Sequence, residues 1–261
     1  MGRSEVYPNP PIALVAVEVR FPPVDGRALG LAHEHIAGLL GSDWIIQNEH
    51  VDELRAPIEP DGAPNFFSSI QRKIVHRKLR RVVTVQSESL TLEVTDYAGF
   101  EDFKALLVES ASAVAEVLHP SGVTRAGLRY IDEITVTEAD PDWGAWLDPS
   151  VLPPVVDSKA PTNWNGAAQY RISADQLLVL RYGPSPTPVV KPAHYPRRLG
   201  APSGPVFVLD FDGSWQPDEV PVFDAEDVAA TISKLRAPIR QLFDAVITEK
   251  LQAVFKEAPQ Q

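Results

Sequence analysis

A run of cations is the part of this sequence best suited to bind phosphate. Six basic residues occur within ten positions that contain no acid: Arg72, Lys73, Arg77, Lys78, Arg80 and Arg81. Arginine and lysine donate charge-assisted hydrogen bonds to phosphate, so the run predicts contact with a nucleic acid, a nucleotide phosphate or an acidic partner. A charged edge strand that prevents aggregation has the same composition, and this second interpretation is favoured.

Two aspartates that follow an apolar segment resemble a catalytic motif. Residues 205–212 contain Asp210 and Asp212, as in the nucleophile motif of phosphatases of the haloacid dehalogenase type, where one aspartate attacks phosphorus and the other acts as an acid. Those enzymes build a parallel domain after the motif, with a later lysine and an acidic pair that binds Mg²⁺. Here most of the residues after Ser214 form one helical pattern. We therefore expect a buried strand that ends in an acidic turn.

A metal site at His33, Glu34 and His35 depends on the local backbone. In a strand the two histidines would share one face, whereas in a helix positions two apart diverge by about 200°. The apolar spacing around them is helical. The chain also has no cysteine, no glycine-rich phosphate loop and no Gly-x-Ser-x-Gly motif. We expect no metal, no cofactor and no catalytic residue.

One predicted strand carries a carboxylate on its apolar face. Residues 122–137 alternate so that Asp132 shares a side with Leu128 and Tyr130. A carboxylate there costs stability unless it is paired, and an arginine is the expected partner. The opposite face carries a second set of polar residues: Arg125, Arg129 and Glu133. If that face lies beneath the C-terminal helix, it forms a polar ligand wall; if it faces water, these side chains are solvated.

The elements that would position these residues can be read from apolar spacing and from the prolines between them. The pattern predicts strands at residues 12–21, from 44 onward, at 81–86, 90–95, 122–137, 169–172, 176–182 and 205–212, and helices at 25–40, around 103–118 and at 225–256. Residues 66–81 fit either a strand or an amphipathic helix, and a strand is favoured. Pro238 should kink the last helix.

These elements predict an α+β fold. Strands precede helices without regular βα alternation, which indicates mainly antiparallel sheet in two related halves, packed by a middle helix and a long C-terminal helix. The halves are residues 1–120 and 121–261, in one compact unit. Residues 56–65 are a predicted loop. The proline-rich residues 184–205 are expected to form a mobile surface loop with a second group of polar residues: Lys191, His194, Tyr195, Arg197 and Arg198.

Composition limits the choice of partner and compartment. The 261 residues include 24 Lys+Arg and 35 Asp+Glu, so the net charge is −11, which opposes general nucleic-acid binding. The N-terminus lacks a signal-peptide core, and no early apolar run is long enough to cross a bilayer. We expect a soluble cytoplasmic protein without membrane contact, and the oligomeric state stays open.

Ordered sequence blocks resemble a sporadically distributed, largely uncharacterised bacterial family of similar length. The blocks are residues 7–12 with 18–21, 97–103, 125–132, 208–212 and 243–248. Asp132 departs from the family pattern, which usually has Asn at that position. The family has no assigned catalytic residues, and its patchy occurrence implies mobile genes such as toxin–antitoxin, phage-related or defence loci.

Three hypotheses about function follow. The first is a non-enzymatic interaction or regulatory protein, of the antitoxin-like or phage-defence type, whose acidic surface masks a basic protein partner. The second is a nucleic-acid or nucleotide-phosphate binding protein that uses residues 72–81. The third is a small-molecule enzyme or carrier with a pocket under the C-terminal helix near Arg129 and Asp132. The first hypothesis, which does not require an enzyme, is favoured.

Overall fold

The computed structural model describes residues 7–55, 65–136, 138, 140–157, 159, 161, 163–190 and 196–257, with the backbone alone at 27, 28, 51–55 and 65–69. The predicted loop at 56–65 therefore lies almost wholly outside the described residues. So do Lys191, His194 and Tyr195 of the second basic group.

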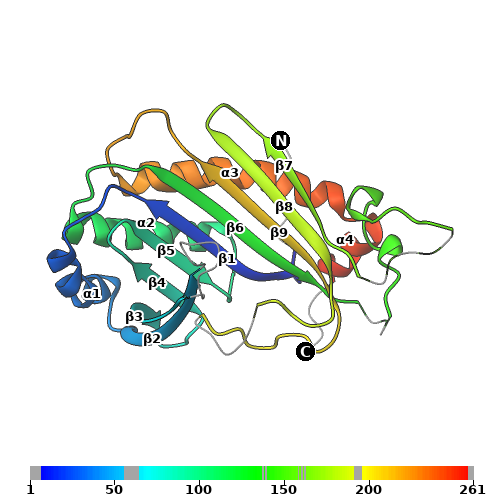
Figure 1. Ribbon diagram of the computed structural model, residues 1–261, viewed down its shortest axis with the longest axis horizontal. Coiled ribbons are helices and arrows are strands. Elements are labelled where there is room, and N and C mark those ends of the chain that lie inside the picture. Colours follow the sequence, from blue (N-terminus) through cyan, green and yellow to red (C-terminus); the bar gives the residue numbers. More distant parts are fainter. Residues whose placement is uncertain are drawn as a thin grey trace.

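Nine strands and four α-helices form the described fold (Figure 1). The strands are β1 (Ile12–Arg20), β2 (Trp44–Arg55), β3 (Asn65–His76), β4 (Arg81–Val85), β5 (Ser89–Val94), β6 (Arg125–Ile134), β7 (Gly166–Arg171), β8 (Gln176–Ser185) and β9 (Val206–Trp215). The helices are α1 (Gly26–Leu40), α2 (Phe100–Leu118), α3 (Ala225–Val246) and α4 (Glu249–Lys256). This composition confirms the predicted α+β class.

All nine strands belong to one antiparallel sheet in the order β2-β3-β4-β5-β1-β6-β9-β8-β7. The first strand of each half lies at the centre, where β1 and β6 pair. Each half then moves to an outer edge and returns by a meander to a place beside its own first strand. A helix follows each return, α2 after β5 and α3 after β9. The two related halves are thus confirmed.

The two halves share this sheet and one apolar core. Pairs such as Val17 with Leu128 join them across the centre of the sheet. The bounds of the two halves, residues 1–120 and 121–261, stay a prediction.

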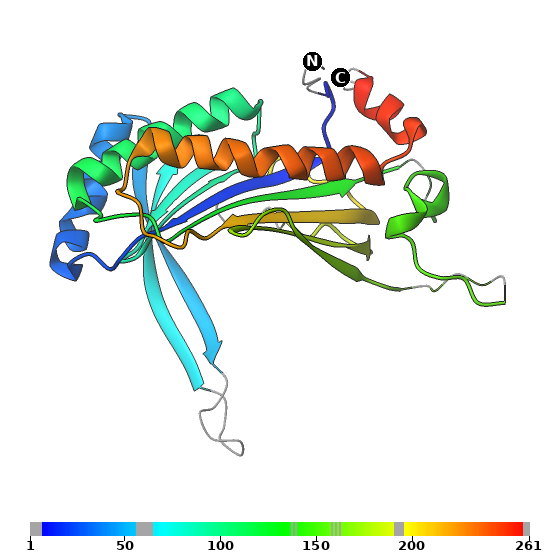
Figure 2. The ribbon, with the colours of Figure 1, turned by 90° about the horizontal axis from the view of Figure 1, so that it is seen from above.

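Helices α2 and α3 lie side by side on the same face of the sheet (Figure 2). The strands present alternate side chains to them, as Val15, Val17 and Val19 of β1 do, all fully buried. No helix of the described residues covers the opposite face, which we call the open face. The β2–β3 ribbon extends away from the sheet on that side (Figure 2).

The C-terminal helix differs from its prediction, because it is two helices. The chain continues helically through Pro238, ends α3 at Val246 and begins α4 at Glu249. At the break, Ile247 forms an isolated β-bridge with Leu147, and both the amide and the hydroxyl of Thr248 donate to the Trp146 carbonyl, at 3.2 and 2.8 Å. Contacts with this distant segment therefore interrupt the helix, and Pro238 does not end it.

Candidate functional site

A cavity of about 390 Å³ lies beneath α3, between that helix and the sheet. This volume falls in the range of about 300–1,000 Å³ that is typical of small-molecule sites. Four segments form its walls: residues 7–12, residues 97–100, strand β6 and helix α3. The lining residues are mainly apolar and aromatic: Tyr7, Pro8, Pro10, Pro11, Ile12, Tyr97, Ala98, Gly99, Phe100, Tyr130, Asp132, Arg236, Ile239, Arg240 and Phe243.

The segment that precedes β1 closes one side of this cavity. Its prolines lack backbone N–H groups, so this wall has few backbone donors. The segment is held at both ends: the Glu133 amide donates to the Pro11 carbonyl at 2.8 Å, and the Asn9 amide donates to the Phe255 carbonyl at 3.0 Å. The ring of Tyr7 also packs on Phe255, with ring centroids 5.6 Å apart.

Asp132 of β6 is a buried carboxyl group on the sheet side of the cavity. Only 3% of the residue is exposed, and its Oδ1 atom has no hydrogen-bond partner among the residues that the structure describes. Burial raises the pKa of Asp132 to about 8, although the positive charge of Arg240 opposes the shift. The carboxyl group is therefore mostly protonated at neutral pH. The sequence correctly predicted that this carboxylate shares the apolar face of the strand.

Two tyrosine hydroxyls add polar atoms to the wall. The hydroxyl oxygens of Tyr97 and Tyr130 lie 3.3 Å apart, within hydrogen-bond distance, and the two rings meet edge to face. Burial raises the pKa of both tyrosines, so both hydroxyls stay protonated at neutral pH. They offer a donor and an acceptor to a molecule in the cavity.

Two arginines, Arg236 and Arg240, supply positive charge from the helix side. They lie one helical turn apart on α3, so both point toward the same side of the helix. The guanidinium of Arg236 lies over the ring of Phe100, 4.6 Å from its centroid, and that of Arg240 lies 4.8 Å from the centroid of Tyr7. Such contacts between a cation and an aromatic ring hold the charges at the cavity wall.

Arg236 and Arg240 were not among the predicted binding residues. The apolar stripe of the helix passes directly beside them, at Leu235 and Ile239, and charged residues beside a stripe are normally solvated. The one available signal was their spacing of four residues. That spacing places them together but does not indicate which surface they face.

Arg129 does not join Asp132 in the cavity. The two residues lie three positions apart in β6, so their side chains project to opposite faces of the sheet. On the open face, Arg129 Nε and Nη2 donate to the two carboxylate oxygens of Asp210 at 2.8 and 2.9 Å. The predicted polar wall of Arg125, Arg129 and Glu133 is therefore not beneath the C-terminal helix, because α3 covers the other face.

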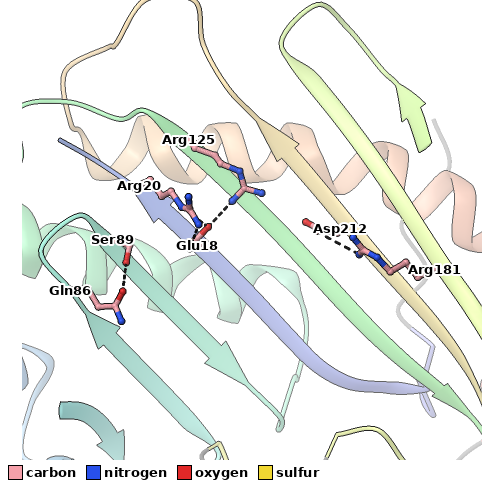
Figure 3. A network of polar contacts seen from close by, with 7 residues as sticks. All are labelled: Glu18, Arg20, Gln86, Ser89, Arg125, Arg181 and Asp212. Atoms are coloured by element: carbon pink, nitrogen blue, oxygen red, sulfur yellow. Dashed lines mark hydrogen bonds and ion pairs between the residues drawn. The ribbon is translucent and has the colours of Figure 1, made fainter. Parts of the chain in front are cut away.

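Ion pairs continue across the open face (Figure 3). Glu18 accepts hydrogen bonds from Arg125 at 2.6 Å and from Arg20 at 3.0 Å. Arg181 lies 3.9 Å from Asp212. These charges neutralise one another within the sheet, so the open face presents paired side chains.

Asp210 and Asp212 do not end a strand as the sequence suggested. They lie inside β9, which continues to Trp215 with Asp210 paired opposite Ile131 and Asp212 opposite Arg129. The acidic turn is therefore absent at this position, and the two carboxylates meet arginines on the open face. The antiparallel sheet around them also differs from the parallel domain that the phosphatase motif requires.

The basic run is divided between a strand and a turn. Arg72 and Lys73 lie in β3, which confirms a strand over residues 66–76; Arg77, Lys78 and Arg80 lie in the turn that follows, and Arg81 begins β4. Four of the six cations pair with acids of the same chain: Arg72 with Glu34, Lys73 with Glu49, Arg77 with Asp43 at 3.9 Å and Arg81 with Asp96 at 3.0 Å. These pairs reduce the positive field that the run would present to phosphate.

The histidines of residues 33–35 lie in α1, which confirms the helical interpretation. His33 is buried, and its two ring nitrogens lie 3.0 and 3.2 Å from the carbonyl oxygens of Leu29 and Val85. Across the ranges that the structure describes, no three His, Cys, Asp or Glu side chains gather closely enough to hold a metal ion.

Comparison of the chain with protein-family models and with curated proteins found no significant match. In the described part of the chain, each helix is too short or too polar to traverse a lipid bilayer.

Proposed function

We propose that this protein binds a small molecule in the cavity beneath α3. The observation that carries the proposal is the Oδ1 atom of Asp132, a buried polar atom that lines this cavity and lacks a hydrogen-bond partner among the described residues. A buried polar atom without a partner costs about 1–3 kcal/mol. A bound molecule that hydrogen-bonds to Asp132 removes this cost.

The architecture does not require a carboxyl group at this place. Strand β1 has the same position in its half as β6 has in the other, and it presents valines to the helices, among them Val17 and Val19. A β6 with only apolar residues on this face would avoid the cost of a buried polar group. The cost of Asp132 therefore supports a role in binding.

The interaction-protein and nucleic-acid hypotheses remain predictions. The intramolecular pairs of Arg72, Lys73, Arg77 and Arg81 weigh against a strong phosphate site on residues 72–81. The cavity, by contrast, combines an apolar body with a few polar groups directed at its contents, which is the usual composition of a ligand site.

Binding of the neutral fluorescent probe N-phenyl-1-naphthylamine tests the proposal. Its two aromatic groups suit the apolar walls, and its N–H can donate to Asp132. We expect the probe to bind with a rise in fluorescence. Ala98→Trp should weaken this binding about ten-fold or more, equivalent to ~1.4 kcal/mol, because Ala98 lines the cavity and an indole would occupy it.

The matched control is Ala237→Trp. Ala237 is also an exposed alanine, but it lies on α3 outside the cavity lining. This variant should bind the probe like the wild type. A wild-type protein that fails to bind the probe, or equal binding by the two tryptophan variants, would contradict the proposed function.

A further inference from the structure

We infer that the ligand of this cavity presents a hydrogen-bond donor and an acceptor side by side to Asp132, as a cyclic amide or a heterocycle with adjacent N–H and C=O groups does. This inference rests on the proposed function and adds the chemical class of the ligand. It is carried by the buried carboxyl group of Asp132, which lines the cavity and whose Oδ1 atom has no hydrogen-bond partner among the described residues.

The carboxyl group of Asp132 holds a proton at neutral pH. Burial raises its pKa to about 8, and the positive charge of Arg240 opposes this shift without reversing it. An ionised carboxylate that is buried without a hydrogen bond would cost far more free energy than a protonated one. The group that a ligand meets at Asp132 is therefore a carboxylic acid, whose O–H donates and whose carbonyl oxygen accepts.

A ligand with an N–H group beside a C=O group matches both atoms of this acid at once. Its N–H donates to the carbonyl oxygen of Asp132, and its C=O accepts from the O–H of Asp132. Both bonds form inside a largely apolar cavity, where a donor or an acceptor that is left without a partner is costly. The adjacent pair therefore removes the cost of burying Asp132 more completely than a single polar group can.

Other common polar groups satisfy only part of the same acid. An amine donates to the carbonyl oxygen of Asp132 but leaves its O–H without an acceptor. A ketone or an ionised carboxylate accepts from the O–H but leaves the carbonyl oxygen without a donor. An alcohol has its donor and its acceptor on one oxygen atom, so it cannot meet both atoms of the acid in good geometry.

Several other polar side chains of the cavity wall already bond within the protein. The hydroxyl oxygens of Tyr97 and Tyr130 lie 3.3 Å apart, within hydrogen-bond distance, and Nε of Arg240 donates to Oδ2 of Asp244 at 2.9 Å. A ligand gains less from these groups, because a bond to them replaces or adds to one that exists. Asp132 is therefore the polar group of the wall from which selectivity is expected.

Two isomers of one heterocycle test this inference. In 2-quinolone the N–H and C=O groups are adjacent, whereas in 4-quinolone they lie on opposite sides of the ring, so the isomers share size and composition. We expect the wild-type protein at pH 6 to bind 2-quinolone about ten-fold tighter than 4-quinolone, equivalent to ~1.4 kcal/mol. Displacement of bound N-phenyl-1-naphthylamine measures both affinities.

Two variants show which side chain produces this preference. Asp132→Leu should bind the two isomers equally, because leucine has nearly the shape of aspartate but neither donates nor accepts a hydrogen bond. A rise in the fluorescence of N-phenyl-1-naphthylamine shows that this variant still forms the cavity. The matched control is Tyr97→Phe, which removes a hydroxyl from the same cavity wall and should keep the preference for 2-quinolone.

Each result bears on one of the two claims. If the wild type binds N-phenyl-1-naphthylamine but binds the isomers equally, prefers 4-quinolone or binds neither isomer, the inference is overturned while the proposed function stands. A preference that survives in Asp132→Leu or disappears in Tyr97→Phe would assign the pairing to another group and would overturn the inference as well. If the wild type does not bind N-phenyl-1-naphthylamine, the proposed function fails, and the inference that rests on it fails too.

Discussion

Asp132→Asn is expected to increase the free energy of unfolding by up to roughly 5 kcal/mol at pH 8 and to change it little at pH 4. The pKa of this carboxyl group is about 8 in the folded protein against 3.8 for an exposed aspartate. Between these two values the folded state holds a proton that the unfolded state has released. Rising pH therefore favours the unfolded state by about 1.4 kcal/mol per unit. Asparagine is neutral throughout and removes this penalty.

Urea unfolding of the two proteins at pH 4, 6 and 8 measures the effect. The stability that a protonated Asp132 provides is nearly complete at pH 4 and is lost as the pH approaches 8, so the two curves should separate steadily. Asp218→Asn, at an exposed position, should follow the wild type at every pH. Parallel pH profiles for Asp132→Asn and the wild type would show that this carboxyl group titrates normally.

Glu133→Ala is expected to destabilise the protein by roughly 3–5 kcal/mol, the usual cost of leaving a buried charge without its partner. The carboxylate of Glu133 accepts hydrogen bonds from the amides of Val189 and Val190 at 2.7 and 2.8 Å and pairs with Arg198, and its side chain has no exposed surface. Its removal leaves Arg198, which is 11% exposed, and two amides without their acceptor.

Hydrogen exchange of the backbone amides shows which part of the protein loses stability in Glu133→Ala. The amides of Val189 and Val190 should exchange much faster in Glu133→Ala than in the wild type. Glu18→Ala is the control, because Glu18 also pairs with arginines on the open face but is 32% exposed, and its loss should cost at most about 1 kcal/mol. Equal protection of the two amides in both variants would show that Glu133 does not hold this segment.

The bonds to Glu133 also anchor part of the proline-rich segment. The sequence predicted a mobile loop over residues 184–205 because of its prolines. In the described part of this segment, Arg198 and the two valine amides are tied to a buried carboxylate, and the Arg197 amide donates to the Leu79 carbonyl at 2.6 Å. Composition alone cannot indicate that a glutamate about 56 residues earlier accepts these bonds.

Much of the fold could be predicted because apolar alternation and turn residues are local signals. The valines of β1 and the buried side chains of α2 follow the periods of a half-buried strand and an amphipathic helix. The break between α3 and α4 could not be predicted in this way. Its apolar spacing continues through Ile247, and the contacts that interrupt it come from Trp146 and Leu147, far away in the chain.

The candidate site could be predicted only in part, for a similar reason. The alternation of side chains along β6 identified Asp132 as a carboxyl group on an apolar face. The same alternation places Arg129 on the opposite face, but the sequence does not indicate which face the C-terminal helix covers. Arg236 and Arg240 become part of the site only because α3 lies over β6, so their role depends on tertiary packing.

Asp132 is expected to lower stability in exchange for binding. Asparagine at this position would avoid the penalty expected for a buried carboxyl group. If this chain keeps an aspartate at a cost in stability, the gain is expected in binding. The Asp132→Asn variant should therefore be more stable than the wild type at pH 8 and should bind the naphthylamine probe more weakly.

A crystal structure of the protein grown with N-phenyl-1-naphthylamine tests directly whether the cavity beneath α3 binds small molecules. We expect the aromatic groups of the probe to lie beneath α3, between Phe100 and Tyr7, with the amine nitrogen within hydrogen-bond distance of Asp132. A probe bound only at another surface, with the cavity beneath α3 filled by protein side chains, would contradict it.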